Sequence, residues 1–365
     1  MSRKNRDHLG NGALMITDEK ILILGAGKFG TCLAQHLARE GHKVTLFCRR
    51  QSVTEEINQN HVNATAHPDT SLNPNISATS ILDAAALSEY SIIVNAIPVQ
   101  AHRKLLRKIG PGLTAKHLYI SVSKGIDAET GALPSQILAA CAEQRVADNA
   151  VILFGPSFAE EVLAQEPTAL VAACLNPEKA EAAQSIFHTN TLRVYTSQDP
   201  LGLEVSGALK NIIAIAAGAA SGLGLQSNAK AALITRGLNE ILKVGLTRGA
   251  NPMTFLGLGG VGDLLLTCGS TQSRNYRVGY LLGQGVSLNE AIEQVGSVAE
   301  GVFTSKAAYR WVSDENLDCP IITQTYAILH ESRDVKAAVT QLLNRPSTSE
   351  FDSDFLAQYF AEQAT

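Results

Sequence analysis

The chain has 365 residues, of which 45% are hydrophobic and 18% charged, and its 30 Lys and Arg against 34 Asp and Glu give a formal net charge of −4. This is the composition of a soluble globular protein, and the absence of a basic block argues against nucleic acid or acidic membranes as partners. At about 100–200 residues per domain, the length predicts two domains, each able to bury a core.

The six cysteines are scattered, with no C-x-x-C and no Cys/His run at metal-ligand spacing. This usage is typical of a reducing compartment, and we expect no metal site. Residues 1–19 form a polar leader whose apolar run, Ala13–Ile16, is too short for a signal peptide, so we expect a cytoplasmic protein.

After the leader, short β-branched runs alternate with helical patterns. Strands that alternate with crossover helices predict an α/β fold, with a mostly parallel, doubly wound sheet covered by helices on both faces. We assign this Rossmann-type sheet to residues 20–198. The expected strands are Ile21–Leu24, Lys43–Phe47, Ser91–Ile97, Leu118–Ser123 and Val151–Phe154, with edge strands at Thr168–Ala173 and Leu192–Tyr195, and the first expected helix is Gly30–Glu40.

The pattern changes at Asp199-Pro200, after which we expect an all-α domain over residues 199–345. Its first helix is predicted to be long and buried, from about Leu201 to Ala220. Residues 211–229 carry no charge, but their strongly apolar part ends near Ala220, short of the roughly 20 residues that a membrane helix needs. Residues 346–365 form a polar tail, in which Phe351–Phe360 is predicted to form one or two amphipathic turns.

A glycine-rich segment, Gly25-Ala26-Gly27-Lys28-Phe29-Gly30, follows the first expected strand. This G-x-G-x-x-G pattern is weak alone, but a strand before it and a helix after it indicate a dinucleotide site. Gly25 suits the tight turn, Gly27 lets the backbone approach a pyrophosphate, and Gly30 lets the helix pack on the sheet. A glycine-rich turn without a ligand is the alternative.

The second expected strand is followed by Arg49 and Arg50, where an NAD-specific site usually carries Asp or Glu. Two guanidinium groups suit the 2′-phosphate of NADP, so we favour NADP over NAD. A pair of solvated surface arginines is the alternative.

Further strand ends should face the same crevice, because ligands of open α/β sheets bind at the carboxyl ends of strands. One strand leads to Pro98, another to Lys124, and a third to Gly155-Pro156-Ser157. Ser157 with Glu160 is predicted to form a capping box that opens a helix, or else to contact a ligand. Lys124 is either a functional cation or a solvated lysine.

The long helix carries one lysine, Lys210, amid small and apolar residues, with Ser206, Gly207 and Ala214 on its face. Such surroundings depress the pKa of a lysine and suit a general acid or base. The alternative is a lysine that extends to a surface carboxylate. Histidine is a poor candidate for this role, because only His330 of the nine histidines lies in the helical domain.

Two loops of the helical domain carry polar groups. Asp263 follows a glycine-rich loop and is either a functional carboxylate or a helix N-cap. Ser273, Arg274 and Asn275 place a hydroxyl, a guanidinium and an amide at another expected helix start. Together they predict a phosphate-binding cradle.

In this order the motifs resemble the bacterial NAD(P)-dependent glycerol-3-phosphate dehydrogenase family. The resemblance covers about Lys20 to Leu343. It is carried by the glycine-rich segment and by Ser123-Lys124-Gly125, Gly155-Pro156-Ser157-Phe158, Gly207-Ala208-Leu209-Lys210-Asn211, Ile234-Thr235-Arg236-Gly237, Gly259-Gly260-Val261-Gly262-Asp263, Ser273-Arg274-Asn275 and Glu300-Gly301.

The resemblance implies reversible reduction of dihydroxyacetone phosphate to sn-glycerol 3-phosphate, the backbone of phospholipids. It implies Lys210 as the group that gives and takes the substrate proton. Substrate contacts are implied for Lys124, Gly155, Ser157, Lys210, Asp263, Ser273, Arg274 and Asn275. Cofactor contacts are implied for Gly25, Gly27, Lys28, Phe29, Gly30, Arg49, Arg50, Lys124, Ala159, Arg274, Val298 and Glu300. A homodimer is a family-level expectation.

The sequence departs from the family at Lys28, where Ser is common, at Phe29, where Trp or Tyr is common, and at Ser157, where Thr is common. Lys28 adds charge beside the expected pyrophosphate. Two other functions stay open at this point. One is a two-domain dehydrogenase of a β-hydroxyacid or ketoacid, and the other is a nucleotide-binding sensor without catalysis.

Overall fold

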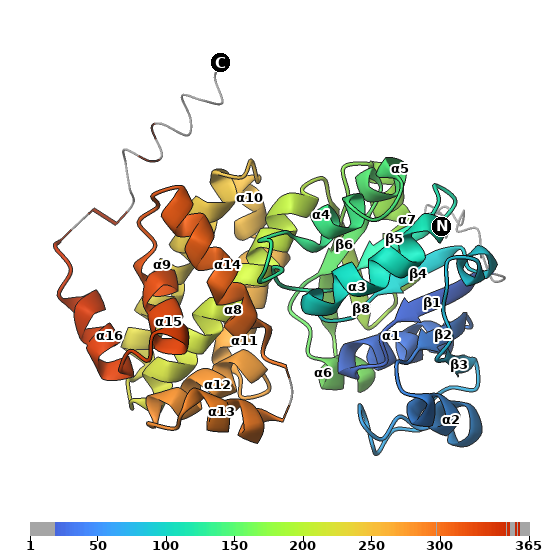
Figure 1. Ribbon diagram of the computed structural model, residues 1–365, viewed down its shortest axis with the longest axis horizontal. Coiled ribbons are helices and arrows are strands. Elements are labelled where there is room, and N and C mark those ends of the chain that lie inside the picture. The colour runs from blue at the N-terminus through green and yellow to red at the C-terminus, as the bar shows by residue number, and fades with distance from the viewer. Residues whose placement is uncertain (1–18, 297, 348, 351–354, 356, 358–365) are drawn as a thin grey trace, which may run out of the picture.

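The computed structural model describes residues 19–296, 298–347, 349, 350, 355 and 357. A sheet flanked by helices makes up one half of the molecule and a bundle of helices the other, with α8 (Pro200–Gly222) running through the bundle (Figure 1). The last strand ends at Ser197, so the change from sheet to bundle takes place over two residues. The α/β fold with an all-α second half is confirmed.

The sheet has eight strands in the order β3-β2-β1-β4-β5-β6-β7-β8. All neighbours are parallel except β6 and β7, which are antiparallel. This arrangement brings the carboxyl ends of β1 to β6 to one edge. The strands are β1 (Lys20–Leu24), β2 (Lys43–Phe47), β3 (Ile76–Thr79), β4 (Ile92–Asn95), β5 (Leu118–Ser121), β6 (Val151–Phe154), β7 (Thr168–Ala173) and β8 (Leu192–Ser197).

Helices cover both faces of the sheet, because alternate side chains of each central strand point to opposite faces. Ile21 and Ile23 of β1 pack against one group of helices, while Leu22 and Leu24 pack against the other. The helices are α1 (Lys28–Arg39), α2 (Gln51–Asn60), α3 (Val99–Ile109), α4 (Pro134–Ala139), α5 (Gln144–Asp148), α6 (Ala159–Leu163) and α7 (Pro177–Phe187), with short 3₁₀ turns η1 (Ala86–Glu89) and η2 (Gly110–Gly112).

The sheet differs from the sequence prediction at its edges. Thr168–Ala173 is not an edge strand, since β7 lies between β6 and β8. The edge beyond β2 is formed by β3, which was not predicted because four residues, Ile-Ser-Ala-Thr, carry too little alternation. The helix expected at Gly30–Glu40 begins earlier, at Lys28. The leader up to residue 18 and most of Phe351–Phe360 lie outside the described residues.

Helices account for the regular structure of residues 200–343. They are α8, α9 (Ser227–Leu246), α10 (Pro252–Phe255), the π-turn η3 (Leu258–Gly262), α11 (Asp263–Gly269), α12 (Arg274–Gly283), α13 (Leu288–Val295), α14 (Glu300–Asp314), α15 (Pro320–His330) and α16 (Val335–Leu343). The carboxylate of Asp199 caps α8 by accepting a hydrogen bond from the Gly202 N–H.

Small residues allow α8 to approach α12 closely. A Cβ at Gly218 would overlap the carbonyl oxygen of Tyr276, and one at Gly279 would overlap that of Ile215. By length and composition, α8 and the stretch 252–269 are apolar enough to cross a membrane, but 94% of the apolar window of α8 is buried inside the protein. The prediction of a buried core helix is therefore confirmed for α8.

Candidate functional site

The glycine-rich segment connects β1 to α1 at the carboxyl edge of the sheet. Gly25 has a φ of +110°, which side chains rarely allow, and a Cβ there would lie 3.1 Å from the Ala96 carbonyl oxygen. A Cβ at Gly30 would overlap the Gly25 carbonyl oxygen. Gly27 caps α1 and has open space beside its Cα. The segment thus fits a pyrophosphate at the α1 N-terminus, as the sequence indicated.

The loop after α2, which sequence reasoning missed, holds the glycine-rich segment in place by hydrogen bonds. The buried Asn63 donates hydrogen bonds to the Ala26 carbonyl oxygen at 3.0 Å and to Thr31 Oγ1 at 2.9 Å. His67 Nε2 lies 2.8 Å from the Lys28 carbonyl oxygen. No local motif marks these two residues, because their role depends on a contact about 35 residues away in sequence.

Three expected cofactor residues lie beside the start of α1. Lys28 is its first residue, and its Nζ lies 2.6 Å from Glu160 Oε1. Phe29 is partly buried against an apolar cluster that includes Ala159, the first residue of α6. The structure therefore brings Lys28, Phe29 and Ala159 together at the contact between α1 and α6.

Arg49 and Arg50 follow β2 and are exposed. Arg50 precedes α2 and donates to Thr65 Oγ1 at 3.2 Å. Two strands, β1 and β4, lie between β2 and β5, whose end leads to Lys124. At about 4.8 Å per strand, the two ends are roughly 14 Å apart, a separation that an extended dinucleotide spans.

Lys124, Asp263 and Lys210 come together where the sheet meets the bundle. Nζ of Lys210, on α8, lies 2.5 Å from Asp263 Oδ1, and Nζ of Lys124, after β5, lies 2.8 Å from Asp263 Oδ2. Lys210 and Asp263 are 4% and 1% exposed, whereas Lys124 is partly exposed. One buried carboxylate therefore joins a lysine from each domain. It is the first residue of α11 and follows the Gly262 N-cap, so the N-cap alternative for Asp263 is wrong.

The charges in this cluster set its protonation. Burial lowers the pKa of Lys210 to about 7, and the proximity of Lys124 acts in the same direction, although the Asp263 carboxylate opposes both. Burial alone would raise the pKa of Asp263, but Lys124 and Lys210 together hold it below its usual range. Asp263 is thus ionised at neutral pH, while Lys210 is poised to give or take a proton.

Thr267 is a further member of the cluster that sequence reasoning missed. Its Oγ1 accepts a hydrogen bond from Lys210 Nζ at 2.8 Å and donates one to the Asp263 carbonyl oxygen at 2.6 Å. Thr267 and Asp263, both on α11, thus each bond to the amine of Lys210. The i, i+4 spacing from Asp263 was the available signal, because it places both residues on one face of a helix.

The segment after β6 supplies Gly155 and Ser157. A Cβ at Gly155 would lie 2.6 Å from the Ala169 carbonyl oxygen, and the Gly155 carbonyl oxygen faces Lys124 Nζ at 3.4 Å. Ser157 donates to that same oxygen at 3.1 Å. The predicted capping box of Ser157 and Glu160 is wrong, because α6 begins later, at Ala159, with Phe158 as its N-cap.

The expected phosphate cradle lies at the start of α12. Ser273 caps the helix by accepting from the Tyr276 N–H, and Arg274 is exposed beside it. Asn275 is buried, donates to Asn211 Oδ1 at 2.9 Å and accepts from the Gly301 N–H at 2.9 Å. Because Asn211 follows Lys210 directly, these amides hold the cradle in a constant position relative to the lysine.

Glu300, the first residue of α14, faces the end of β5. Its Oε2 and the Thr304 Oγ1 are buried without hydrogen-bond partners, and a Cβ at Gly125 would lie 3.2 and 3.3 Å from them. Burial raises the pKa of Glu300 to about 7, against the attraction of Arg274. Both oxygens therefore lie against Gly125, the residue that follows Lys124. Val298, two residues earlier, is 43% exposed.

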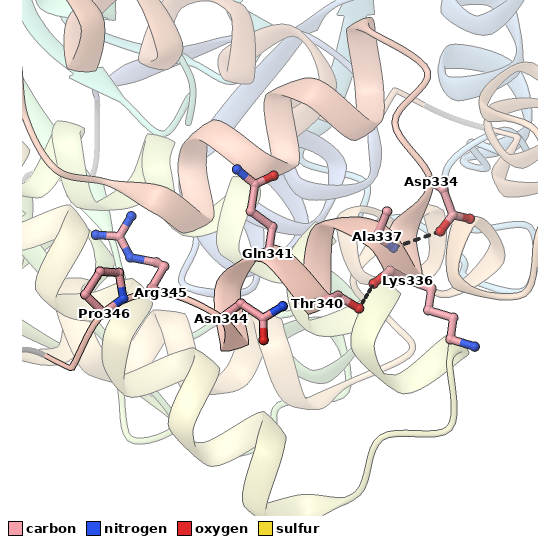
Figure 2. Close-up of a pocket in the computed structure, with 8 residues that line it drawn as sticks. All are labelled: Asp334, Lys336, Ala337, Thr340, Gln341, Asn344, Arg345 and Pro346. Atoms are coloured by element: carbon pink, nitrogen blue, oxygen red, sulfur yellow. Dashed lines mark hydrogen bonds between the residues drawn. The ribbon is translucent and has the colours of Figure 1, made fainter.

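Within the described part of the chain, His, Cys, Asp and Glu nowhere gather in a group that could hold a metal ion. Two surface depressions lie away from Lys210. One of about 750 Å³ lies along α16, at the outer end of the bundle, and is lined mainly by polar side chains, as Figure 2 shows. Another, of about 910 Å³, lies at the amino ends of β1 and β5, at the opposite edge of the sheet from the glycine-rich segment.

Two family descriptions match the chain: the NAD-dependent glycerol-3-phosphate dehydrogenase N-terminus over residues 20–180 and its C-terminus over residues 199–340. A glycerol-3-phosphate dehydrogenase (NAD(P)+) of Lysinibacillus sphaericus is 45% identical over 92% of this chain and 98% of its own. A glycerol-3-phosphate dehydrogenase (NAD(P)+) of Listeria innocua is 43% identical over 93% of this chain and 100% of its own. The crystal structure of glycerol-3-phosphate dehydrogenase from Coxiella burnetii matches with a TM-score of 0.84 at 35% identity, over 90% of this chain and all of that one.

A Rossmann-type sheet and a helical domain that meet at a lysine define an oxidoreductase that uses a nicotinamide dinucleotide. Within that class, the chain belongs to the NAD-dependent glycerol-3-phosphate dehydrogenase family, as the matched family descriptions and relatives establish.

Proposed function

We propose that the protein reversibly reduces dihydroxyacetone phosphate to sn-glycerol 3-phosphate and so supplies the backbone of phospholipids. The observation that carries the proposal is the buried contact of Lys210 with Asp263, 2.5 Å apart, at the junction of the two domains. The nicotinamide dinucleotide supplies and accepts the hydride when it is bound. The side chains of this chain bind, orient and exchange the proton.

Lys210 is the group that we assign to the proton transfer. Its pKa of about 7 leaves both protonation states populated at neutral pH, so it protonates the C2 oxygen in reduction and deprotonates the C2 hydroxyl in oxidation. Asp263 and Thr267 hold its Nζ in one orientation, and Lys124 adds a second positive charge beside the oxygen. Positive charge placed before the reaction stabilises the oxyanion that develops in the transition state.

Ser273, Arg274 and Asn275 are the groups that we assign to the substrate phosphate. They combine the N-terminus of α12 with a guanidinium and an amide, which together suit a phosphate. Gly155 and Ser157 complete the substrate contacts near Lys124. Binding energy from the phosphate then orients the carbonyl against Lys210.

For the cofactor, we propose NADP as the preferred form, with NAD also accepted. Gly25, Gly27 and Gly30 are assigned to the pyrophosphate, and Arg49 and Arg50 are assigned to the adenosine 2′-phosphate. Beside them, Lys28, Phe29 and Ala159 line the start of α1, while Lys124, Arg274, Val298 and Glu300 are assigned to the nicotinamide half.

Steady-state reduction of dihydroxyacetone phosphate, with NADPH and NADH side by side, tests this function. We expect saturable turnover that requires the substrate phosphate, since unphosphorylated dihydroxyacetone leaves the cradle empty. Turnover of β-ketoacids with no turnover of the phosphate ester would contradict the assigned substrate. Equal catalytic efficiency with both dinucleotides would contradict the role of Arg49 and Arg50.

We further propose a cytoplasmic homodimer. All six cysteines are unpaired, as is typical of proteins in a reducing compartment. Met253, Leu256 and Leu265, on α10, just after it and on α11, are apolar side chains that are 66%, 63% and 54% exposed, and we assign the contact with a second copy to this part of the chain. Light scattering after size-exclusion chromatography measures the mass directly, and a monomer at micromolar concentration would contradict the dimer.

A further inference from the structure

An ion pair connects the two helices that begin beside the glycine-rich segment. Lys28, directly after the Gly27 N-cap, is the first residue of α1, and Glu160 lies in the first turn of α6. Their charged atoms are 2.6 Å apart, and both side chains are about half exposed, at 61% and 47%. The lysine thus directs its charge to a carboxylate, although its backbone lies where a helix N-terminus would meet a pyrophosphate.

The two helices that carry this pair, α1 and α6, pack against each other. Cys32 of α1 packs against Ala159 and Val162 of α6, and Arg39 donates to the Leu163 carbonyl oxygen at 2.9 Å. The hydrogen bond from His67 holds the backbone of Lys28. Because α6 cannot drift away from α1, Glu160 stays within reach of the lysine.

The charge of Glu160 persists at neutral pH. Burial by itself would raise its pKa, but the hydrogen bond and the attraction from Lys28 bring the pKa below its usual range, and His67 acts in the same direction. A pyrophosphate at the N-terminus of α1 would therefore meet a lysine already neutralised by an ionised carboxylate. Charge-assisted bonds from Lys28 to the phosphates require the lysine to leave Glu160 or to share itself between the two.

We propose that Glu160 is a positioning residue that competes with the dinucleotide phosphates for Lys28, and that it thereby weakens dinucleotide binding and speeds release of the spent dinucleotide. The proposal rests on the dinucleotide site of the proposed function. The neighbouring carboxylate, Glu161, serves as a matched control, because it accepts a hydrogen bond from Gln272 at 2.9 Å and does not contact Lys28.

The test is a binding measurement on the full chain, with NADPH titrated into the protein and its fluorescence recorded at low and moderate salt. Glu160→Gln should lower the dissociation constant for NADPH by about threefold, the size expected for an exposed ion pair. Lys28→Met should raise the dissociation constant for NADPH. In the Lys28→Met background, Glu160→Gln should lower the dissociation constant by less than half as much as it does in the wild-type background. The dissociation constant of Glu161→Gln should stay within about twofold of that of wild type.

Two results would overturn the proposal. One is unchanged or weaker binding by Glu160→Gln, which would make Glu160 neutral or a partner that aims Lys28 at the ligand. The other is equal tightening with and without Lys28, which would assign the effect to the general field of the carboxylate. Wild-type protein that fails to bind NADPH would instead refute the dinucleotide site itself, so the two failures are distinguishable.

A second measurement needs no cofactor. Acetylation of Lys28 by a small reagent, followed by peptide mass spectrometry, reports how free its amine is. We expect Glu160→Gln to speed the modification of Lys28 and to leave that of the exposed Lys43 unchanged. An unchanged rate at Lys28 would show that Glu160 does not hold the lysine.

Discussion

The carboxylate of Asp263 lies 2.5 Å from the amine of Lys210, and both side chains are almost completely buried. Lys210 is in the middle of α8 and Asp263 begins α11, so the contact depends on how two helices pack. Removing one member of such a pair leaves the other charge buried and uncompensated. The proton-transfer role proposed for Lys210 depends on this arrangement.

Replacement of Lys210 by Met should remove proton transfer and preserve much of the side-chain volume. We expect kcat/KM for dihydroxyacetone phosphate to fall by about 100- to 10,000-fold, the usual contribution of a general acid. NADPH binding, measured by fluorescence titration, should change by less than about threefold, because Lys210 belongs to the substrate side of the site. Turnover at the wild-type rate would refute the assignment.

The two directions of the reaction should respond oppositely to pH. Reduction needs the protonated amine of Lys210, so its kcat/KM should fall as pH rises through about 7, whereas oxidation of glycerol 3-phosphate should increase over the same range. Initial rates between pH 5.5 and 9 in a constant-ionic-strength buffer measure both profiles. Parallel profiles in the two directions would contradict a single acid–base lysine.

Asp263→Asn should move that pH dependence in a defined direction. The Asp263 carboxylate raises the pKa of Lys210 against the effect of burial, so its neutralisation should lower this pKa below 7. The loss of reduction should then begin at lower pH than in wild type. If kcat/KM for reduction instead began to fall at a higher pH than in wild type, Asp263 would not stabilise the protonated lysine.

Arg50→Gln should affect the use of NADPH and that of NADH differently. Loss of a charge-assisted contact with the 2′-phosphate should raise the KM for NADPH by about tenfold and leave the KM for NADH within about twofold. Lys43→Gln is the matched control, because it removes one positive charge at the other end of β2. Equal effects on both dinucleotides would place Arg50 away from the 2′-phosphate.

Gly218→Ala should destabilise the helical domain. The added Cβ would overlap the Tyr276 carbonyl oxygen and lie 2.9 Å from the Tyr280 N, so α8 and α12 would have to separate. We expect a loss of about 1–3 kcal/mol in the free energy of unfolding, measured by urea denaturation. The control is Gly269→Ala, where no atom lies within 4 Å of the new Cβ. Equal stability of the two variants would contradict close packing of these helices.

Much of the architecture was predictable because its signals are local. The glycines of residues 25–30, the alternation of strands with helices and the apolar run of α8 each reflect a few neighbouring residues. The same holds for Ser273, which caps the helix that it precedes. Predictions failed where local signals were weak or competed. The edge strand β3 is only four residues long, and the hydroxyl of Ser157 bonds to Gly155 instead of capping α6.

By itself, then, the sequence determined the alternation of strands and helices that gives way to an all-helical half, the turn that suits a pyrophosphate, and the lysines and polar groups available for chemistry. The tertiary structure decided which of these groups meet. It placed Asp263 between Lys124 and Lys210, set Asn63 against the glycine-rich segment and turned Lys28 toward Glu160. The reason is physical: helix and turn preferences act over a few residues, whereas these contacts join segments 32 to 139 residues apart, which only tertiary packing within each domain and between the two domains brings together.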